Sequence, residues 1–137
     1  MDITTAFSTI NWLSVIVASL AAFAIGSIWY SPVMFSKTWQ KESNLTDYDL
    51  KNASMPVIFG SAFVLMFISA VLLDMFIGPG GTAGSGLVMG LVVSLGWIVT
   101  ALGVNYLFGR KSITLFLIDA GYFVVFFAAM GLILGAW

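Results

Sequence analysis

The apolar residues of this chain fall into four long stretches, at about residues 10–30, 56–76, 87–108 and 113–134, separated by shorter polar segments. An α-helix that crosses the hydrocarbon core of a bilayer needs about 20 apolar residues, and each stretch meets that length. Each is apolar all round rather than along one stripe, which is not typical of a surface helix. The pattern predicts an all-α, polytopic membrane protein with four transmembrane helices in one domain, residues 1–137.

Composition supports lipid as the main surrounding of this chain. Hydrophobic residues make up 61% of the sequence and charged residues only 8%, against about 45–50% and about 25% in an ordinary globular chain. A small soluble domain must cover a large surface with polar groups, and five basic and six acidic side chains are too few for that. We therefore expect the lipid bilayer as the principal partner. Without a basic run, no nucleic acid partner is expected.

The basic residues predict how the helices are oriented. Lys37, Lys41 and Lys51 lie between the first two stretches, and Arg110 and Lys111 between the last two. Four crossings place these two loops on the same side of the membrane. Because basic loops stay inside, loops 31–55 and 109–112 are predicted to be cytoplasmic. Both termini are then outside, which in a bacterium means the periplasmic side of the cell (inner) membrane.

The first loop has features of its own. Ser31 and Pro32 end the first helix and have the residue types of an N-cap and a first helical position. Phe35 and Trp39 would then share one face of a short amphipathic helix at the membrane surface. Residues 46–49 (Thr-Asp-Tyr-Asp) resemble a capping box with Asp in place of Glu, which predicts a second short helix.

Short runs along the chain form a recognisable set. They are Asn11-Trp12-Leu13, residues 26–32 (Gly-Ser-Ile-Trp-Tyr-Ser-Pro) with Phe35, Lys37 and Trp39, residues 105–108 (Asn-Tyr-Leu-Phe), residues 118–122 (Ile-Asp-Ala-Gly-Tyr), Met130-Gly131 and Gly135-Ala136-Trp137. This set resembles the bacterial "domain of unknown function 1761" membrane family over nearly the whole chain. The resemblance implies a four-helix membrane protein and brings no established activity.

The acidic residue Asp119 is the most informative polar residue in the apolar stretches. It lies about two turns into the fourth stretch, where a charged side chain costs roughly 2.5–3.5 kcal/mol on insertion scales. Such residues face the bundle interior or a water-filled cavity and often mark an ion or substrate path. The alternative is a structural acid bonded to neighbouring helices. By depth, we predict an intramembrane polar cluster of Asp119 with Asn105, Tyr30, Tyr122 and Arg110.

A second carboxylate, Asp74, lies near the outer end of the second stretch. By depth it is level with Asn11 and Ser14 at the start of the first stretch. We predict a polar group of Asp74 and Asn11 on the periplasmic side. The alternative is that the Asp74 carboxylate simply reaches interfacial water.

Small residues recur at four-residue spacing on three helices. The ridges are Ser14, Ala18, Ala22 and Gly26 on the first, Gly86, Gly90 and Ser94 on the third, and Gly131 and Gly135 on the fourth. Such ridges let helix backbones approach closely in membranes. Packing within one chain explains most of them, but four helices have little interior of their own. We therefore expect at least one ridge to serve a subunit contact in a homo-oligomer.

The absence of cysteine and histidine from the sequence narrows the possible functions. It removes disulfides, thiol chemistry, Cys/His zinc sites and histidine general bases. We expect no cofactor, no metal site and no enzymatic activity. The leading hypothesis is a small homo-oligomeric transporter or channel-like protein in which Asp119 binds a proton, small ion or solute. The alternative is a structural or accessory protein that organises a partner or lipids, with the Phe35 and Trp39 helix as its contact surface.

Overall fold

A computed structural model describes residues 2–137, and its regular elements within these residues are all helices, without strands. Its elements are α1 (Ile3–Ser8), α2 (Trp12–Trp29), α3 (Ser36–Glu42), α4 (Asp47–Lys51), α5 (Met55–Ile77), α6 (Ala83–Val93), η1 (Ser94–Ile98), α7 (Val99–Phe108) and α8 (Ile113–Ala136). Helices α6, η1 and α7 form one continuous span, Ala83–Phe108, so four helices are long and apolar enough to cross a membrane. The all-α prediction with four such helices is confirmed.

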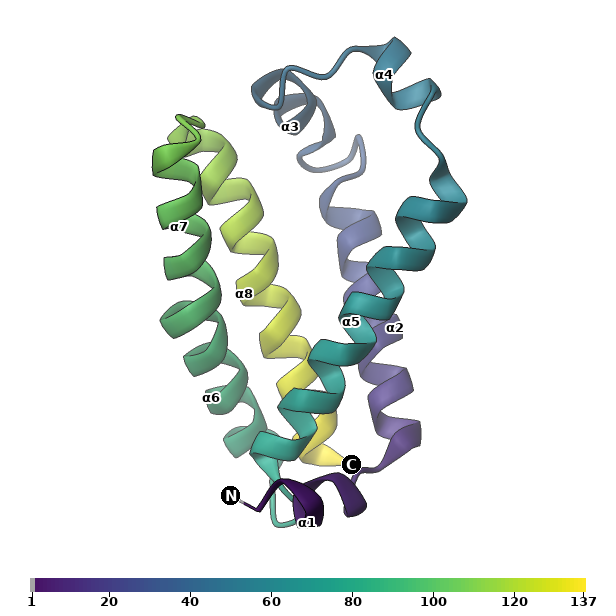
Figure 1. The fold of residues 1–137 in the computed structure, drawn as a ribbon, viewed down its shortest axis with the longest axis vertical. Coiled ribbons are helices and arrows are strands. Elements are labelled where there is room, and N and C mark those ends of the chain that lie inside the picture. Colours follow the sequence, from purple (N-terminus) through teal and green to yellow (C-terminus); the bar gives the residue numbers. More distant parts are fainter. Residues whose placement is uncertain (1) are drawn as a thin grey trace.

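The last helix, α8, is the centre of the bundle. It packs against α6, α2 and α5, most extensively against α6. Figure 1 shows α1, the α5–α6 connection and the end of α8 together at one end of the molecule, with α3, α4 and the α7–α8 turn at the other. The outward faces carry exposed large apolar residues, such as Leu20, Leu65, Val92 and Leu117. Large exposed apolar surfaces of this kind mark a membrane-facing exterior.

Polar side chains fix where the spanning helices begin. Asn11 and Ser112 act as N-caps, and each accepts a hydrogen bond from the backbone N–H three residues on. Thr82 forms a capping box with Ser85. The third span therefore starts at Ala83, four residues before the apolar run at Leu87, because the cap rather than hydropathy sets its first turn.

The first loop folds differently from the sequence expectation. Residues 31–35 form turns, and α3 starts only at Ser36. The Phe35 ring packs against Trp29, with ring centroids 4.9 Å apart, and the Trp39 ring packs against Tyr30 at 5.8 Å. Phe35, just before α3, and Trp39 within α3 are therefore half-buried against the bundle.

The short helix α4 has the capping box that residues 46–49 predicted. The Thr46 backbone N–H donates to the Asp49 carboxylate at 2.9 Å, and the Asp49 N–H donates to the Thr46 hydroxyl at 3.1 Å. Hydrogen bonds from the backbone and side chain of Thr46 hold the pKa of Asp49 below its ordinary value.

This capping box makes α4 sensitive to acid. The pKa of Asp49 is lower in the folded state than in the unfolded state. The Asp49 carboxylate therefore stabilises α4 fully above its unfolded-state pKa, and this stabilisation is lost as the pH falls through its folded-state pKa. We expect α4 to fray below about pH 4, seen as a lower hydrogen-exchange protection factor at the Leu50 amide. In Asp49→Asn this pH dependence should disappear. Equal protection at neutral and acid pH in the wild type would contradict the assignment.

Glycines allow the close contact between α6 and α8. A Cβ added at Gly86 would overlap the carbonyl oxygen of Gly131, and one added at Gly131 would overlap that of Gly86. Gly90 and Gly135 lie just as close to carbonyl groups of the facing backbone. The ridges of small residues on α6 and α8 therefore pack against each other within one chain, as small-xxx-small ridges do in membranes.

The small residues of α2 are also used inside the chain. Ala18 and Ala22 have no exposed surface, and α2 packs against both α8 and α5. Gly26 leaves space for Tyr122, because a Cβ there would lie 2.7 Å from the phenol oxygen. The small residues that the sequence analysis placed on the α2 ridge therefore serve packing within one chain.

Candidate functional site: two carboxylates at opposite ends of the bundle

The first site is the Asp119 cluster, which we define as Asp119, Tyr30, Tyr106, Trp29 and Tyr122. The Tyr30 hydroxyl donates to one carboxylate oxygen of Asp119 at 2.6 Å, and the Tyr106 hydroxyl donates to the other. Asp119 is on α8, Tyr106 on α7 and Tyr30 directly after α2. One carboxylate thus joins three helices, with a phenol donor on each oxygen.

Two further polar groups of the cluster bind backbone carbonyls. The Trp29 Nε1–H donates to the Ile118 carbonyl at 3.0 Å, and the Tyr122 hydroxyl donates to the Ala22 carbonyl at 3.0 Å. Both acceptors lie in spanning helices, where a polar side chain in apolar surroundings is costly unless it is hydrogen-bonded. Together these bonds fix α2 against α8 at this end of the bundle.

The π-helical segment η1 helps Tyr106 reach Asp119. Positions on the α8-facing side recur every four residues: Gly86, Gly90 and Ser94 are buried, and Ile98, Leu102 and Tyr106 are half-buried. An α-helix has 3.6 residues per turn, so steps of four drift around its axis. The wider turn of η1, Ser94–Ile98, offsets part of that drift and keeps Tyr106 turned toward α8.

Two residues expected in the cluster lie elsewhere. Asn105 is exposed on α7, because the neighbouring residue Tyr106 takes the inward position and successive helical residues point about 100° apart. Arg110 is exposed in the α7–α8 turn with a left-handed backbone, φ 55°. Its N–H bonds the Leu107 carbonyl and the Lys111 N–H bonds that of Tyr106, which is a Schellman end to α7. The turn directs Arg110 into a surface groove instead.

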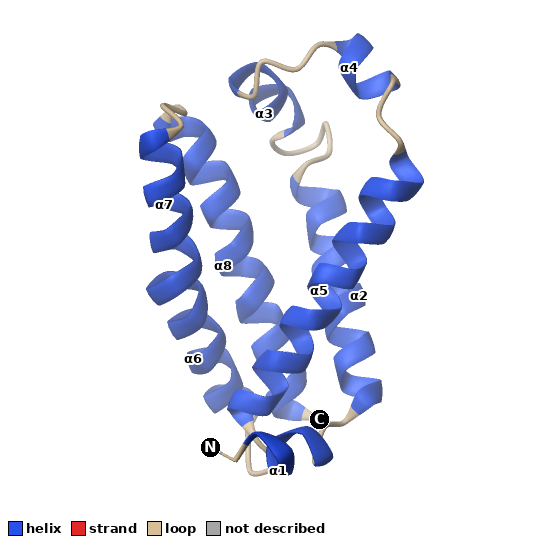
Figure 2. Ribbon diagram, viewed as in Figure 1, coloured by secondary structure: helices blue, strands red, loops and turns tan. Residues whose placement is uncertain are grey.

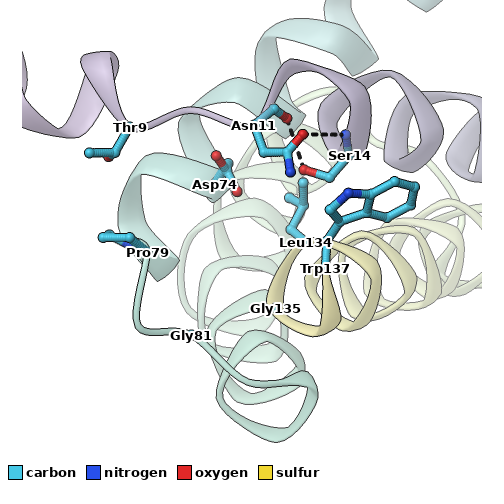
Figure 3. Close-up of a pocket in the computed structure, with 10 residues that line it drawn as sticks. Thr9, Asn11, Ser14, Asp74, Pro79, Gly81, Leu134, Gly135 and Trp137 are labelled. Carbon is cyan, nitrogen blue, oxygen red and sulfur yellow. Dashed lines mark hydrogen bonds between the residues drawn. The ribbon is translucent and has the colours of Figure 1, made fainter.

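The second site is the Asp74 pocket, a polar cavity of about 210 Å³ at the α1 end of the bundle. Its polar side chains are Asp74, Asn11, Ser14 and Thr9, and the indole of Trp137 also lines it. Figure 3 shows the Asp74 carboxylate beside Asn11, with Trp137 and Leu134 of the α8 end close by. The backbone N–H of Asn11 faces the half-buried Asp74 carboxylate. Asp74 and Asn11 are thus brought together, while Thr9 and Trp137 gave no sequence signal for this site.

The core between the two sites is apolar. Asp119 and Leu134, which lines the Asp74 pocket, are separated by roughly 22 Å of helix α8. Val15, Leu73, Phe126 and Met130 fill this layer and are at most 3% exposed. Buried serines in the bundle donate to carbonyls of their own helices, as Ser19 does to Val15 at 2.7 Å. This layer offers no continuous polar path from one carboxylate to the other.

Two apolar cavities flank α5 where it leaves the bundle. Figure 2 shows α5 close to α8 near the α1 end and diverging from it toward α4. A cavity of about 390 Å³ lies between α5 and α2, and one of about 400 Å³ between α5 and α8. Both are lined by Ala62, Met66 and Tyr122. Ile58 and Phe59, which line the first, are about half exposed at 48% and 52%, so that cavity opens sideways to the surroundings of the bundle.

A basic groove of about 510 Å³ lies at the α3 end, between α3 and the α7–α8 turn. It is lined by Lys41, Arg110 and Lys111, with Glu42 as its one acidic side chain. Asn44, on its rim, has a left-handed backbone like that of Arg110, with φ 56°. A left-handed backbone costs free energy in residues other than glycine. The hydrogen-bonded turns that follow α3 and α7 therefore have to stabilise Asn44 and Arg110 in this conformation.

Comparison with known proteins identifies the family without adding an activity. No curated protein and no solved structure matches this chain significantly. A family model described as a protein of unknown function (DUF1761) matches residues 13–135. That range includes all four spanning helices apart from their outermost residues. The chain therefore belongs to the DUF1761 family of proteins of unknown function.

Proposed function

We propose that this protein is an accessory membrane protein that binds a phospholipid beside α5, without transport or catalysis. The observation that carries the proposal is the pair of apolar cavities flanking α5. In a membrane such cavities are filled by whatever lies beside the helices, and the lining of Phe, Ile, Met and Ala residues suits an acyl chain. Because α5 diverges from α8 in a wedge, the chain would enter from the bilayer.

The charge distribution supports an anionic phospholipid. All five basic residues lie at the α3 end of the molecule, and the basic groove has three cationic side chains against one carboxylate. The positive-inside rule predicts a cytoplasmic location for this end, which is the prediction made above for loops 31–55 and 109–112. The cytoplasmic leaflet carries the anionic headgroups that attract such residues.

Filling the cavities should displace the lipid. Ala62 lines both cavities, so Ala62→Trp should lower the amount of phospholipid retained by the purified protein about tenfold. The protein is reconstituted in phosphatidylethanolamine and phosphatidylglycerol, extracted in mild detergent and assayed by mass spectrometry for bound lipid. Val64→Trp is the matched control, because Val64 is on the same helix but 55% exposed and outside both cavities. Equal retention by both variants would contradict the proposal.

The transport hypothesis for Asp119 is supported less well by this geometry. Both carboxylate oxygens accept phenol hydrogen bonds, and Asp119 lines neither cavity beside α5. What favours a structural role is the link between three helices that the two phenol bonds make. The homo-oligomer expected from the sequence remains a prediction. The ridges of small residues that suggested it pack inside one chain, so they no longer argue for a subunit contact.

A further inference from the structure

We infer that the Asp74 pocket is a binding site for a small organic ammonium cation, with the Asp74 carboxylate as its counter-charge and Trp137 as a further lining residue. This site is independent of the proposed lipid site, since it lies at the opposite end of the bundle. It is built from five parts of the chain: the α1–α2 connection, the first turn of α2, the end of α5, the α5–α6 connection and the end of α8.

Charge is the first argument for a cation. Among the described residues 2–137, Asp74 contributes the only charged side chain that lines the pocket, and no Lys or Arg lines it. The sequence has no Lys or Arg in residues 1–36, 52–109 and 112–137, so all basic residues lie at the other end. The other carboxylate of this end, Asp2, is engaged in capping α1, where it accepts hydrogen bonds from Thr4 and Thr5. Asp74 is therefore a half-buried carboxylate without a cationic neighbour in its own pocket.

Geometry favours an organic cation over a metal ion. No group of three or more acidic, His or Cys residues able to hold a metal occurs within residues 2–137. The cavity of about 210 Å³ is far larger than the roughly 10–15 Å³ needed for a single water molecule, so it has room for an organic ion. Trp137 also lines the pocket, and aromatic side chains are a common second contact for quaternary ammonium groups. Thr9, Ser14 and Gly78 also line the pocket, and the hydroxyls of Thr9 and Ser14 donate to the backbone carbonyls of Ala6 and Asn11.

The test uses the full chain in lipid nanodiscs with choline as the probe, and saturation-transfer NMR as the readout. The neutral isostere 3,3-dimethyl-1-butanol has the same shape without the charge. We expect saturable binding of choline, at least about tenfold tighter than that of the neutral isostere. Asp74→Asn should reduce choline affinity about tenfold or more, and Trp137→Leu should reduce it while leaving the helices intact. Asp2→Asn is the control for long-range charge and should bind choline like the wild type.

Each outcome decides the inference. Absence of saturable choline binding in the wild type, equal binding of the neutral isostere, or equal affinity in wild type and Asp74→Asn would overturn it. Displacement of choline by calcium at equal concentration would also overturn it, because it would assign the pocket to a metal ion. Circular dichroism is recorded for each variant to check that its helices are retained. If Asp74→Asn does not fold, Trp137→Leu still tests the site.

Discussion

Replacement of Gly86 or Gly131 by alanine is expected to destabilise the bundle by about 3 kcal/mol, the upper part of the range for overpacking. A Cβ at either position overlaps a backbone carbonyl of the facing helix, so no side-chain rotation relieves the contact and α6 must move away from α8. The α6–α8 contact is the most extensive in the chain. Moving it would loosen the packing of the central helix as a whole.

The matched control is Gly60→Ala on α5. No atom lies within 4 Å of a Cβ added at Gly60, and alanine is favoured over glycine in a helix by up to about 1 kcal/mol. We therefore expect this variant to equal or exceed the wild type in stability. The measurement is the free energy of unfolding in mixed micelles, followed by circular dichroism. If Gly86→Ala and Gly60→Ala behaved alike, the close α6–α8 contact would be wrong.

Removal of either phenol from the Asp119 carboxylate should also destabilise the protein. Hydrogen bonds to a charged group contribute about 1.5–3 kcal/mol in soluble proteins, and interhelical bonds in membranes about 0.6 kcal/mol on average. We expect Tyr30→Phe and Tyr106→Phe each to cost about 1–2 kcal/mol. A double-mutant cycle that combines each tyrosine variant with Asp119→Asn should give a non-zero coupling energy, because the tyrosine and Asp119 are partners in the same hydrogen bond.

Tyr48→Phe is the control for loss of a phenol hydroxyl. Tyr48 is 75% exposed on α4, so its variant should have the unfolding free energy of the wild type. The measurement is again unfolding in mixed micelles, with the same detergent composition for every variant. If Tyr30→Phe and Tyr106→Phe had the same unfolding free energy as Tyr48→Phe, the structural role assigned to Asp119 would be contradicted.

The spanning helices could be predicted from sequence because lipid imposes a simple rule on length and hydropathy. The first residue of the third span was harder to predict than the others, since the Thr82 cap acts through hydrogen bonds that hydropathy does not record. The same limit applies to α3. Ser31 and Pro32 have the residue types of an N-cap and first helical position, but the observed N-cap is Phe35, four residues later, whose ring packs on Trp29.

The Asp119 cluster was only partly predictable, because depth along a helix is easier to infer than the direction of a side chain. Tyr30 lies at the expected depth and contacts Asp119. For the third span, depth alone could not separate Asn105 from Tyr106. The four-residue series from Gly86 and Gly90, continued to Tyr106, was the available signal. In a regular α-helix this series would drift around the axis and turn Tyr106 away from α8. The π-helical turn at Ser94–Ile98 that offsets the drift has no recognisable sequence pattern.

The Asp74 pocket illustrates the same limit at the other end of the bundle. Asp74 and Asn11 could be placed at one level from helix boundaries alone. Trp137 comes from the last turn of α8 and Thr9 from the α1–α2 connection. Their approach depends on how connections fold, which hydropathy and spacing do not determine.

Ion flux into proteoliposomes tests most directly whether the Asp119 carboxylate holds helices together rather than conducting. Purified wild type and Asp119→Asn are reconstituted at equal density, and proton and potassium fluxes are followed with entrapped dyes under an imposed gradient. We expect both to match protein-free liposomes, while Asp119→Asn is less stable to unfolding. A wild-type flux above that background, abolished in a folded Asp119→Asn variant, would contradict the structural role and support transport.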